Sequence, residues 1–182
     1  MSDFTLKNGK ILQYRKLQQG DEKLLSTFNA ALSEKSRTLF MPHGYNIETL
    51  AKVINRAESG EDAAFIALDK ERIAAYWFLW WFNTPFPVLG IGILDEFHGL
   101  GLGKQLIQHL INLAETGGCE AIELTTALDN EAGQALYEKT GFKRIGTVEN
   151  ISGDGKITEE IHMVYSIKPG IIPPPRKHDS PV

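Results

Sequence analysis

The chain has 182 residues, of which 42% are hydrophobic and 23% charged, so it has the composition of one globular domain and is neither disordered nor collagen-like. Its formal net charge of −4 argues against a nucleic-acid partner, because proteins that bind phosphate backbones usually carry a basic excess. The single cysteine, Cys119, cannot form an internal disulfide or a multi-cysteine metal site, which favours a reducing compartment.

The N-terminal residues 1–10 lack the apolar segment of a secretory signal. The most apolar stretch, residues 73–82, is about half as long as a helix that spans a bilayer. We therefore predict a soluble, cytoplasmic protein without a membrane partner.

A short strand at 11–15 and two helices are expected in the first third of the chain. Asp21 and Asn46 are candidate caps, and each precedes apolar residues spaced three or four apart. The segment 36–45 between the helices has no clean period and is interpreted as a loop.

Two strands, at 63–68 and 73–82, flank a short polar turn and predict an antiparallel hairpin. The second strand is almost entirely apolar, so both of its faces are expected to be covered. It contains Trp77, Trp80 and Trp81. These rings either form core or line a substrate groove or a subunit contact.

The second half of the chain alternates strands with helices. A helix follows a glycine-rich turn at 99–103 and ends at Gly117-Gly118, and a second helix begins after Asp129-Asn130. The strands are predicted at 88–94, 121–125, 142–148 and 157–167. Together, residues 1–167 are expected to form one domain.

The C-terminal tail, residues 168–182, contains five of the eight prolines. The run Pro173-Pro174-Pro175 excludes a helix or a sheet interior. The tail is therefore predicted to be an extended appendage, more in keeping with a solvated end than with a strap over a neighbouring surface.

The turn from Gly99 to Gly103 has glycine at alternate positions and opens directly onto an amphipathic helix. This arrangement presents backbone N–H groups at the positive end of a helix dipole, which favours phosphate or pyrophosphate. A P-loop does not fit, because His98 stands at its first glycine and Gln105 at its magnesium-binding hydroxyl. A dinucleotide fingerprint fits poorly, because its third glycine would come one residue after Gly103.

The window His98-Gly99-Leu100-Gly101-Leu102-Gly103 resembles the acetyl-CoA signature R/Q-x-x-G-x-G/A of the GNAT family of N-acyltransferases. Downstream, the segment 129–142 is similar to that family's N-x-x-A-x-x-L-Y-x-x-x-G-F element. Both motifs occur in the family's order and spacing and cover about residues 88–145. The chain departs from the family pattern at His98, at Asp95 in place of proline and at Gly133 in place of alanine.

The resemblance implies an α+β GNAT fold, with a mixed central sheet of about seven strands, helices on both faces and a splay between the two central parallel strands. It also implies a metal-free N-acetyltransferase that moves an acetyl group from acetyl-CoA to a primary amine by direct attack. The acceptor would be a small molecule or a peptide N-terminus, and the protein a monomer or homodimer. The alternative is a non-catalytic acyl-CoA-binding or sensing module.

By the same resemblance, Tyr137 is expected to protonate the leaving thiolate. The general base stays open among Glu96, Glu123, Asp95, His43 and a held water. The residues expected to bind the cofactor are Ile91, Gly92, Ile93, Leu94, His98, Gly99, Leu100, Gly101, Leu102, Gly103, Lys104, Asn130 and Tyr137.

The family builds its acceptor pocket from the first two helices, their connection and the last hairpin. Here this implies residues 36–45, 77–81 and 151–157. Trp77, Trp80 and His43 are the candidates for contact with the acceptor. An aromatic lining suits an amine with an apolar body, through cation–π or stacking contacts.

Overall fold

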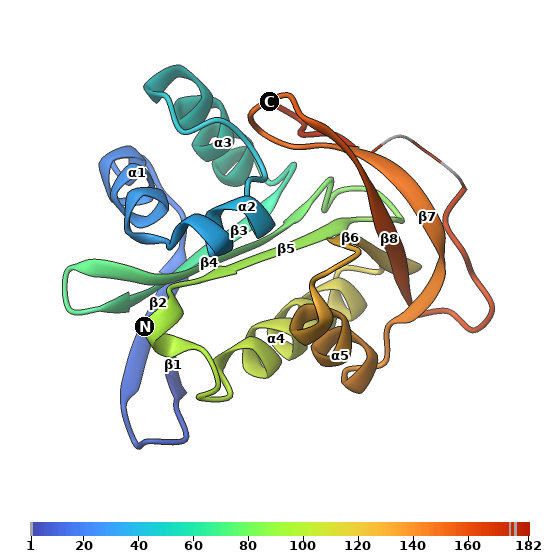
Figure 1. The fold of residues 1–182 in the computed structure, drawn as a ribbon, viewed down its shortest axis with the longest axis horizontal. Helices are drawn as coiled ribbons and strands as arrows, with labels where there is room; N and C mark the ends of the chain where they lie inside the picture. The colour runs from blue at the N-terminus through green and yellow to red at the C-terminus, as the bar shows by residue number, and fades with distance from the viewer. Residues whose placement is uncertain (1, 175, 177) are drawn as a thin grey trace.

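A mixed β-sheet runs through the molecule in the computed structural model, which describes residues 2–174, 176 and 178–182 (Figure 1). Its strands are β1 (Ser2–Thr5), β2 (Ile11–Lys16), β3 (Ala63–Asp69), β4 (Arg72–Trp80), β5 (Val88–Ile93), β6 (Ala121–Ala127), β7 (Lys143–Ile151) and β8 (Ile157–Ser166). They lie in the order β1-β2-β3-β4-β5-β6-β8-β7. Neighbouring strands are antiparallel except at the centre, where β5 and β6 are parallel.

Helices cover both faces of the sheet (Figure 1). One face carries α1 (Glu22–Ala31), α2 (Glu34–Leu39) and α3 (Ile47–Ser59), and the other carries α4 (Leu102–Thr116) and α5 (Glu131–Lys139). A short 3₁₀ turn, η1 (Asp95–Phe97), follows β5. The two-faced arrangement around one parallel strand pair confirms the predicted α+β fold class.

Two elements differ from the prediction. The sheet has an eighth strand, β1, which has only one buried residue, Phe4, and therefore lacks a readable alternation. The segment 36–45 is not all loop, because α2 continues into it from its cap at Ser33. None of the residues of α2 is buried, so this helix carries no apolar period that the sequence could reveal.

The two predicted helix caps have different outcomes. The side chain of Asn46 accepts a hydrogen bond from the Thr49 N–H at 3.0 Å and caps α3 as predicted. The prediction for Asp21 is wrong, because its carboxylate makes no capping bond to α1. Arg15 donates two hydrogen bonds to it, at 2.6 and 2.8 Å, and the N–H of Gln18 donates a third.

The core lies on both sides of β3 and β4. Tyr76, Trp77 and Phe78 are completely or almost completely buried, which confirms that both faces of β4 are covered. Among the described residues, no helix is long and apolar enough to cross a bilayer.

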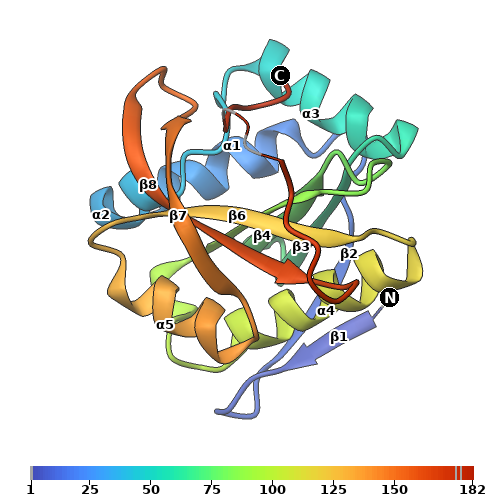
Figure 2. The ribbon, with the colours of Figure 1, turned by 90° about the vertical axis from the view of Figure 1, so that its right-hand side faces the viewer.

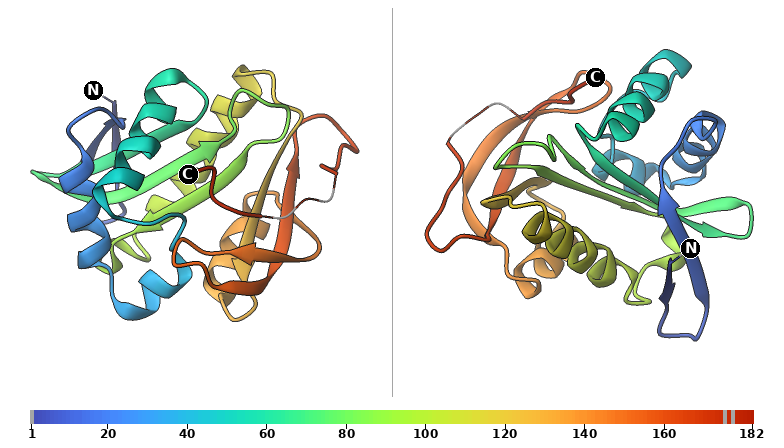
Figure 3. Two further views of the ribbon diagram at one scale, coloured as in Figure 1. Left: turned by 90° about the horizontal axis from the view of Figure 1, so that it is seen from above. Right: turned by 180° about the vertical axis from the view of Figure 1, so that it is seen from behind.

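The tail is a strap, and the predicted solvated end is wrong. The backbone N–H groups of Ile167 and Lys168 both donate to the Glu120 carbonyl, at 3.0 and 2.9 Å. The chain then crosses in front of β6 toward α3 (Figure 2; Figure 3, left). His178 is buried there, and its carbonyl accepts from the Ile151 N–H at 3.0 Å. Pro175, part of the predicted extended run, lies outside the described residues.

Candidate active site

The centre of the sheet is open because the two parallel strands diverge. β5 and β6 pair at Val88 and Glu123, and the Glu123 N–H donates to the Pro87 carbonyl at 3.0 Å. Among the described residues, no further pair joins the two strands downstream. A cavity of about 790 Å³ lies between the diverging strands, the start of α4, α5 and α2.

The glycine-rich turn forms one end of this cavity. Gly99 and Gly101 have φ angles of +73° and +82°, a left-handed conformation that favours glycine. α4 begins directly after Gly101, so the N–H groups of its first turn have no partners within the helix. A Cβ at Gly103 would lie 2.8 Å from Cδ2 of Leu136, so this glycine lets α4 and α5 approach closely. The turn therefore has the geometry of an anion site.

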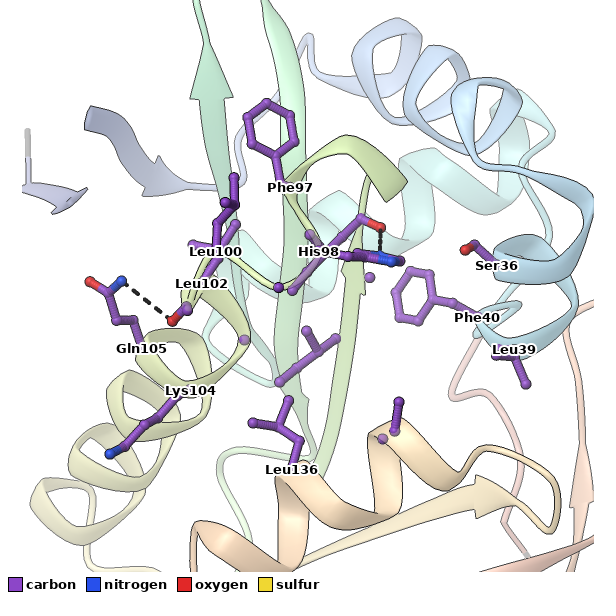
Figure 4. A pocket seen from close by; sticks show the side chains of 18 of the residues that line it. Ser36, Leu39, Phe40, Phe97, His98, Leu100, Leu102, Lys104, Gln105 and Leu136 are labelled. Carbon is purple, nitrogen blue, oxygen red and sulfur yellow. Dashed lines mark hydrogen bonds between the residues drawn. The ribbon is translucent and has the colours of Figure 1, made fainter. Parts of the chain in front are cut away.

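The N-terminal hairpin supports this turn, and the sequence did not reveal that contact. The Lys7 N–H donates to the Leu100 carbonyl at 3.0 Å, and Nε2 of Gln105 donates to the Thr5 carbonyl at 3.0 Å. Lys7 and Lys104 are both among the residues that line the cavity. Side-chain carbons of Lys7 would lie 3.4–3.8 Å from a Cβ at Gly101, whereas the Lys104 side chain points away from the cavity (Figure 4). A cationic side chain from an element far away in the sequence therefore borders the turn.

His98, which replaces the Arg or Gln of the family signature, also lines the cavity. One of its ring nitrogens, Nε2, is 2.9 Å from the Ile93 carbonyl oxygen (Figure 4). This contact holds the imidazole against the end of β5.

The predicted cofactor residues come together in the cavity. All of them line it except Leu94, which is buried beside it. On the opposite side, α2 contributes Ser36 and Leu39, and Phe40 follows directly after this helix (Figure 4). A Cβ at Gly92 would lie 2.4 Å from the Phe40 ring, so the glycine in β5 makes room for this aromatic side chain.

Asn130 has two structural contacts at the start of α5. Its Oδ1 accepts a hydrogen bond from the Gly133 N–H at 3.2 Å, and its Nδ2 donates to Oγ1 of Thr126 at 3.0 Å. A Cβ at Gly133 would lie 2.4 Å from Nδ2 of Asn130. The glycine that departs from the family pattern therefore gives this side chain its space.

Tyr137 lines the cavity from α5. Burial, together with the negative charge of Glu160, raises the pKa of the Tyr137 phenol to about 12. The phenol therefore stays protonated at neutral pH, which is the form that can donate a proton.

None of the four candidate base residues is among the described residues that line the main cavity. Glu96 accepts two hydrogen bonds from Arg72, at 2.7 and 2.9 Å, on the protein surface, and this guanidinium holds the pKa of Glu96 below its usual range. His43 is buried, with Nε2 3.3 Å from the Tyr76 hydroxyl, and burial lowers its pKa to about 4.

Asp95 anchors α2. Its carboxylate accepts hydrogen bonds from the Ser33 N–H and hydroxyl, at 3.1 and 2.8 Å, and from the Ser36 hydroxyl at 2.7 Å. Burial opposes its ionisation, but these hydrogen bonds outweigh that effect and lower its pKa to about 2. Asp95 thus positions the helix that ends directly before Phe40.

Glu123 is completely buried on β6 and is already engaged. Arg176 of the tail forms an ion pair with one carboxylate oxygen, and Nε2 of His162 is 2.8 Å from the other. These partners place Glu123 beneath the tail, and it does not line the main cavity.

The tryptophans of β4 have separate environments. Trp77 is completely buried, and its Nε1–H donates to Nδ1 of His109 in α4 at 3.2 Å. It lies in the core, so the predicted contact of Trp77 with an acceptor is wrong. Trp80 lines a smaller cavity of about 100 Å³ that shares Phe40, Leu89 and Thr125 with the main one. His43 lines neither cavity.

Replacing Trp77 with phenylalanine tests this placement. The change removes the bond to His109 and leaves core space, so we expect the free energy of unfolding to fall by about 1–3 kcal/mol. The KM for an amine acceptor is expected to change by less than about two-fold, which is below about 0.5 kcal/mol. Thermal unfolding and steady-state kinetics measure both effects, and a large rise in acceptor KM would contradict a purely structural role.

The splayed strands and the glycine turn define an α+β domain with an anion site at an open cleft in its sheet. The sequence model of the acetyltransferase (GNAT) family matches residues 29–142, more than half of the chain. The chain therefore belongs to the GNAT acetyltransferase family, as the sequence motifs indicated.

Curated relatives match over shorter segments. Mycothiol acetyltransferase of Paenarthrobacter aurescens is 42% identical over 67 residues, 35% of this chain and 21% of that protein. N-alpha-acetyltransferase RimI of Mycobacterium tuberculosis is 38% identical over 67 residues, 35% of this chain and 40% of that protein. The matches thus span well under half of the length of these relatives.

Solved structures share the fold over nearly the whole chain. The structure of yncA, a putative acetyltransferase from Salmonella typhimurium with its cofactor acetyl-CoA, superposes with a TM-score of 0.67 at 14% identity. The superposition covers 90% of this chain and 98% of that one. At this identity the likeness establishes the fold.

Proposed function

We propose that the protein transfers an acetyl group from acetyl-CoA to a primary amine. The observation that carries the proposal is the single cavity that joins the glycine turn at the start of α4 to half-buried Tyr137 and to Ser36, Leu39 and Phe40 at α2. One end suits a pyrophosphate, the middle offers the free edge of β5, and the far end is open to an acceptor.

The chain's own residues fit acetyl-CoA by their chemistry. The amides from Gly99 to Gly103 and the ammonium group of Lys7 would hold the phosphates. The backbone of Ile91–Ile93 would pair with the amide groups of the pantetheine arm, since β5 has no ladder partner there on the side of β6 among the described residues.

In the proposed reaction the acceptor nitrogen attacks the thioester carbonyl. The C–N bond forms and the C–S bond breaks, and the leaving sulfur takes a proton from the Tyr137 hydroxyl. The proton lost from nitrogen passes to water, because Asp95, Glu96, Glu123 and His43 do not line the cavity, and the Tyr137 phenolate regains a proton from that water. Such a reaction uses acetyl-CoA as co-substrate, which is consistent with a cytoplasmic location.

A thiol-release assay tests the proposal. Acetyl-CoA is incubated with the protein and a panel of amines, including a peptide with a free N-terminus, and free CoA is measured. Amine-dependent release supports acetyl transfer. Tight acetyl-CoA binding without release for any amine would favour the acyl-CoA-binding or sensing module.

Lys7 gives a prediction that tests the cofactor end. Replacing Lys7 with alanine removes a charge beside the turn, so we expect the KM for acetyl-CoA to rise about three- to five-fold at low salt. The effect is expected to shrink at high salt, because exposed charges are screened. Lys52→Ala, on α3 and away from the cavity, is the matched control. Equal KM values for both variants would contradict a phosphate contact.

A further inference from the structure

The C-terminal tail forms part of a second cavity. This cavity, of about 100 Å³, lies beside the main one and shares Leu89, Gly90 and Thr125 with it. The residues that line it include Trp80 of β4, Glu160 of β8, and His178 and Asp179 of the tail. Without His178 and Asp179, the cavity would lack the wall that the tail supplies.

A buried ion pair anchors this wall. Glu123 is completely buried, and Arg176 supplies the positive charge that a buried carboxylate requires. The Arg176 guanidinium also donates to the Phe86 carbonyl at 3.1 Å and lies 4.7 Å from the centre of the Trp81 ring. Three kinds of contact thus fix the Arg176 side chain: an ion pair, a hydrogen bond and a cation–π contact.

The backbone at His178 completes the anchor. Its carbonyl accepts from the Ile151 N–H at 3.0 Å, and its N–H donates to the Glu149 carbonyl at 3.4 Å. The imidazole is buried 4.9 Å from the ring of His162, and burial lowers the pKa of His178 to about 4. His178 is therefore neutral at pH 7 and adds no charge beside Arg176.

The same cluster brings ligand atoms of Glu123, His162 and His178 within 4.8 Å of one another. A divalent metal would meet Arg176 on the same carboxylate. Two cationic groups would then share one buried negative charge, which is unfavourable. The ion pair alone balances the charge, so the cluster is better explained as the anchor of the tail.

We propose that tail residues His178 and Asp179 form a wall of the acceptor subsite, and that Asp179 and Glu160 attract the positive charge of the amine substrate. The proposal rests on the proposed acetyl transfer, because it assigns the second cavity to the acceptor of that reaction. Asp179 and Glu160 line the cavity together with Phe78 and Trp80, and the Glu160 carboxylate also accepts hydrogen bonds from Asn150 and Thr158. Negative charge beside aromatic faces suits an organic ammonium.

Charge-removing variants of the full-length protein test this assignment. Spermidine, a triamine, and benzylamine, a monoamine, serve as acceptors in the thiol-release assay. For Asp179→Asn we expect the KM for spermidine to rise about five-fold, with a smaller rise for benzylamine and an unchanged KM for acetyl-CoA. Glu159→Gln, one residue from Glu160 and outside the cavity, is the matched control and is expected to leave all three values unchanged.

A second variant tests the anchor. Arg176→Gln leaves Glu123 without its cation, so the tail is expected to detach and the spermidine KM to rise about ten-fold. Hydrogen exchange at the Ile151 amide, which His178 protects, reports detachment directly. Exchange that stays slow together with an unchanged KM would show that the ion pair does not hold the wall.

The outcomes separate this proposal from the proposed function. Equal spermidine KM values for Asp179→Asn and Glu159→Gln, with amine-dependent CoA release intact, would overturn the wall and leave acetyl transfer standing. A lower spermidine KM in Arg176→Gln would overturn it too, because the tail would then obstruct the acceptor. If no amine releases CoA, acetyl transfer fails, and titration of spermidine into the CoA-saturated variants makes the same comparison of affinities.

Discussion

Replacing Tyr137 with phenylalanine is expected to lower kcat by about 100-fold, the typical contribution of a general acid. The ring stays, so its packing against Phe142 is kept and the protein is expected to fold normally. Burial raises the pKa of Tyr137 to about 12, so the wild-type phenol holds its proton throughout the pH range of an assay. Only the proton donor for the leaving sulfur is lost.

The affinity for acetyl-CoA separates this explanation from a binding defect. Titration calorimetry is expected to give similar dissociation constants for Tyr137→Phe and the wild type. Tyr165→Phe, which removes an equivalent hydroxyl from β8 outside the cavity, is the control and is expected to keep its kcat. Full activity in Tyr137→Phe would exclude this residue as the essential acid.

The second large effect is expected at Gly101. Valine there must leave the left-handed conformation or adopt it at a cost of about 1–2 kcal/mol, so the turn before α4 is rebuilt. The amides then no longer converge on one point. We expect the dissociation constant of acetyl-CoA to rise more than about ten-fold, which corresponds to about 1.4 kcal/mol.

Gly60 supplies a matched control for this strain. It ends α3 with a φ of +81°, nearly the +82° of Gly101, and it does not line the cavity. Gly60→Val therefore carries a similar backbone penalty away from the turn. Both variants are expected to lose stability in thermal unfolding, but only Gly101→Val loses acetyl-CoA binding. Equal losses of binding would mean that the turn has no specific role.

Local signals made the cofactor end of the site predictable. The glycines at 99–103 allow a left-handed backbone directly before the start of α4. Both the turn and the helix start depend on a few consecutive residues, so the local sequence is enough to predict them. Asn130 and Tyr137 follow from the resemblance of the segment 129–142 to one element of the family. The sequence therefore located the side of the cavity that α4 and α5 build, with Leu94 displaced into the core beside it.

Long-range contacts made the rest unpredictable. Lys7 reaches the turn from a hairpin about ninety residues earlier, and Arg176 meets Glu123 only because the tail crosses β6. Two candidate bases, Glu96 and Glu123, each pair with an arginine far away in the sequence, and no local pattern identifies these partners. The prediction for Trp77 failed because the alternation of side chains along β4 does not show which face of the strand packs against α4.

The most direct test of the whole account is isothermal titration of the purified protein with acetyl-CoA, with NAD and ATP as controls. The account predicts binding of acetyl-CoA at one site per chain and much weaker or no binding of both controls. A folded protein that does not bind acetyl-CoA, or that binds NAD instead, would contradict the assignment of the central cavity.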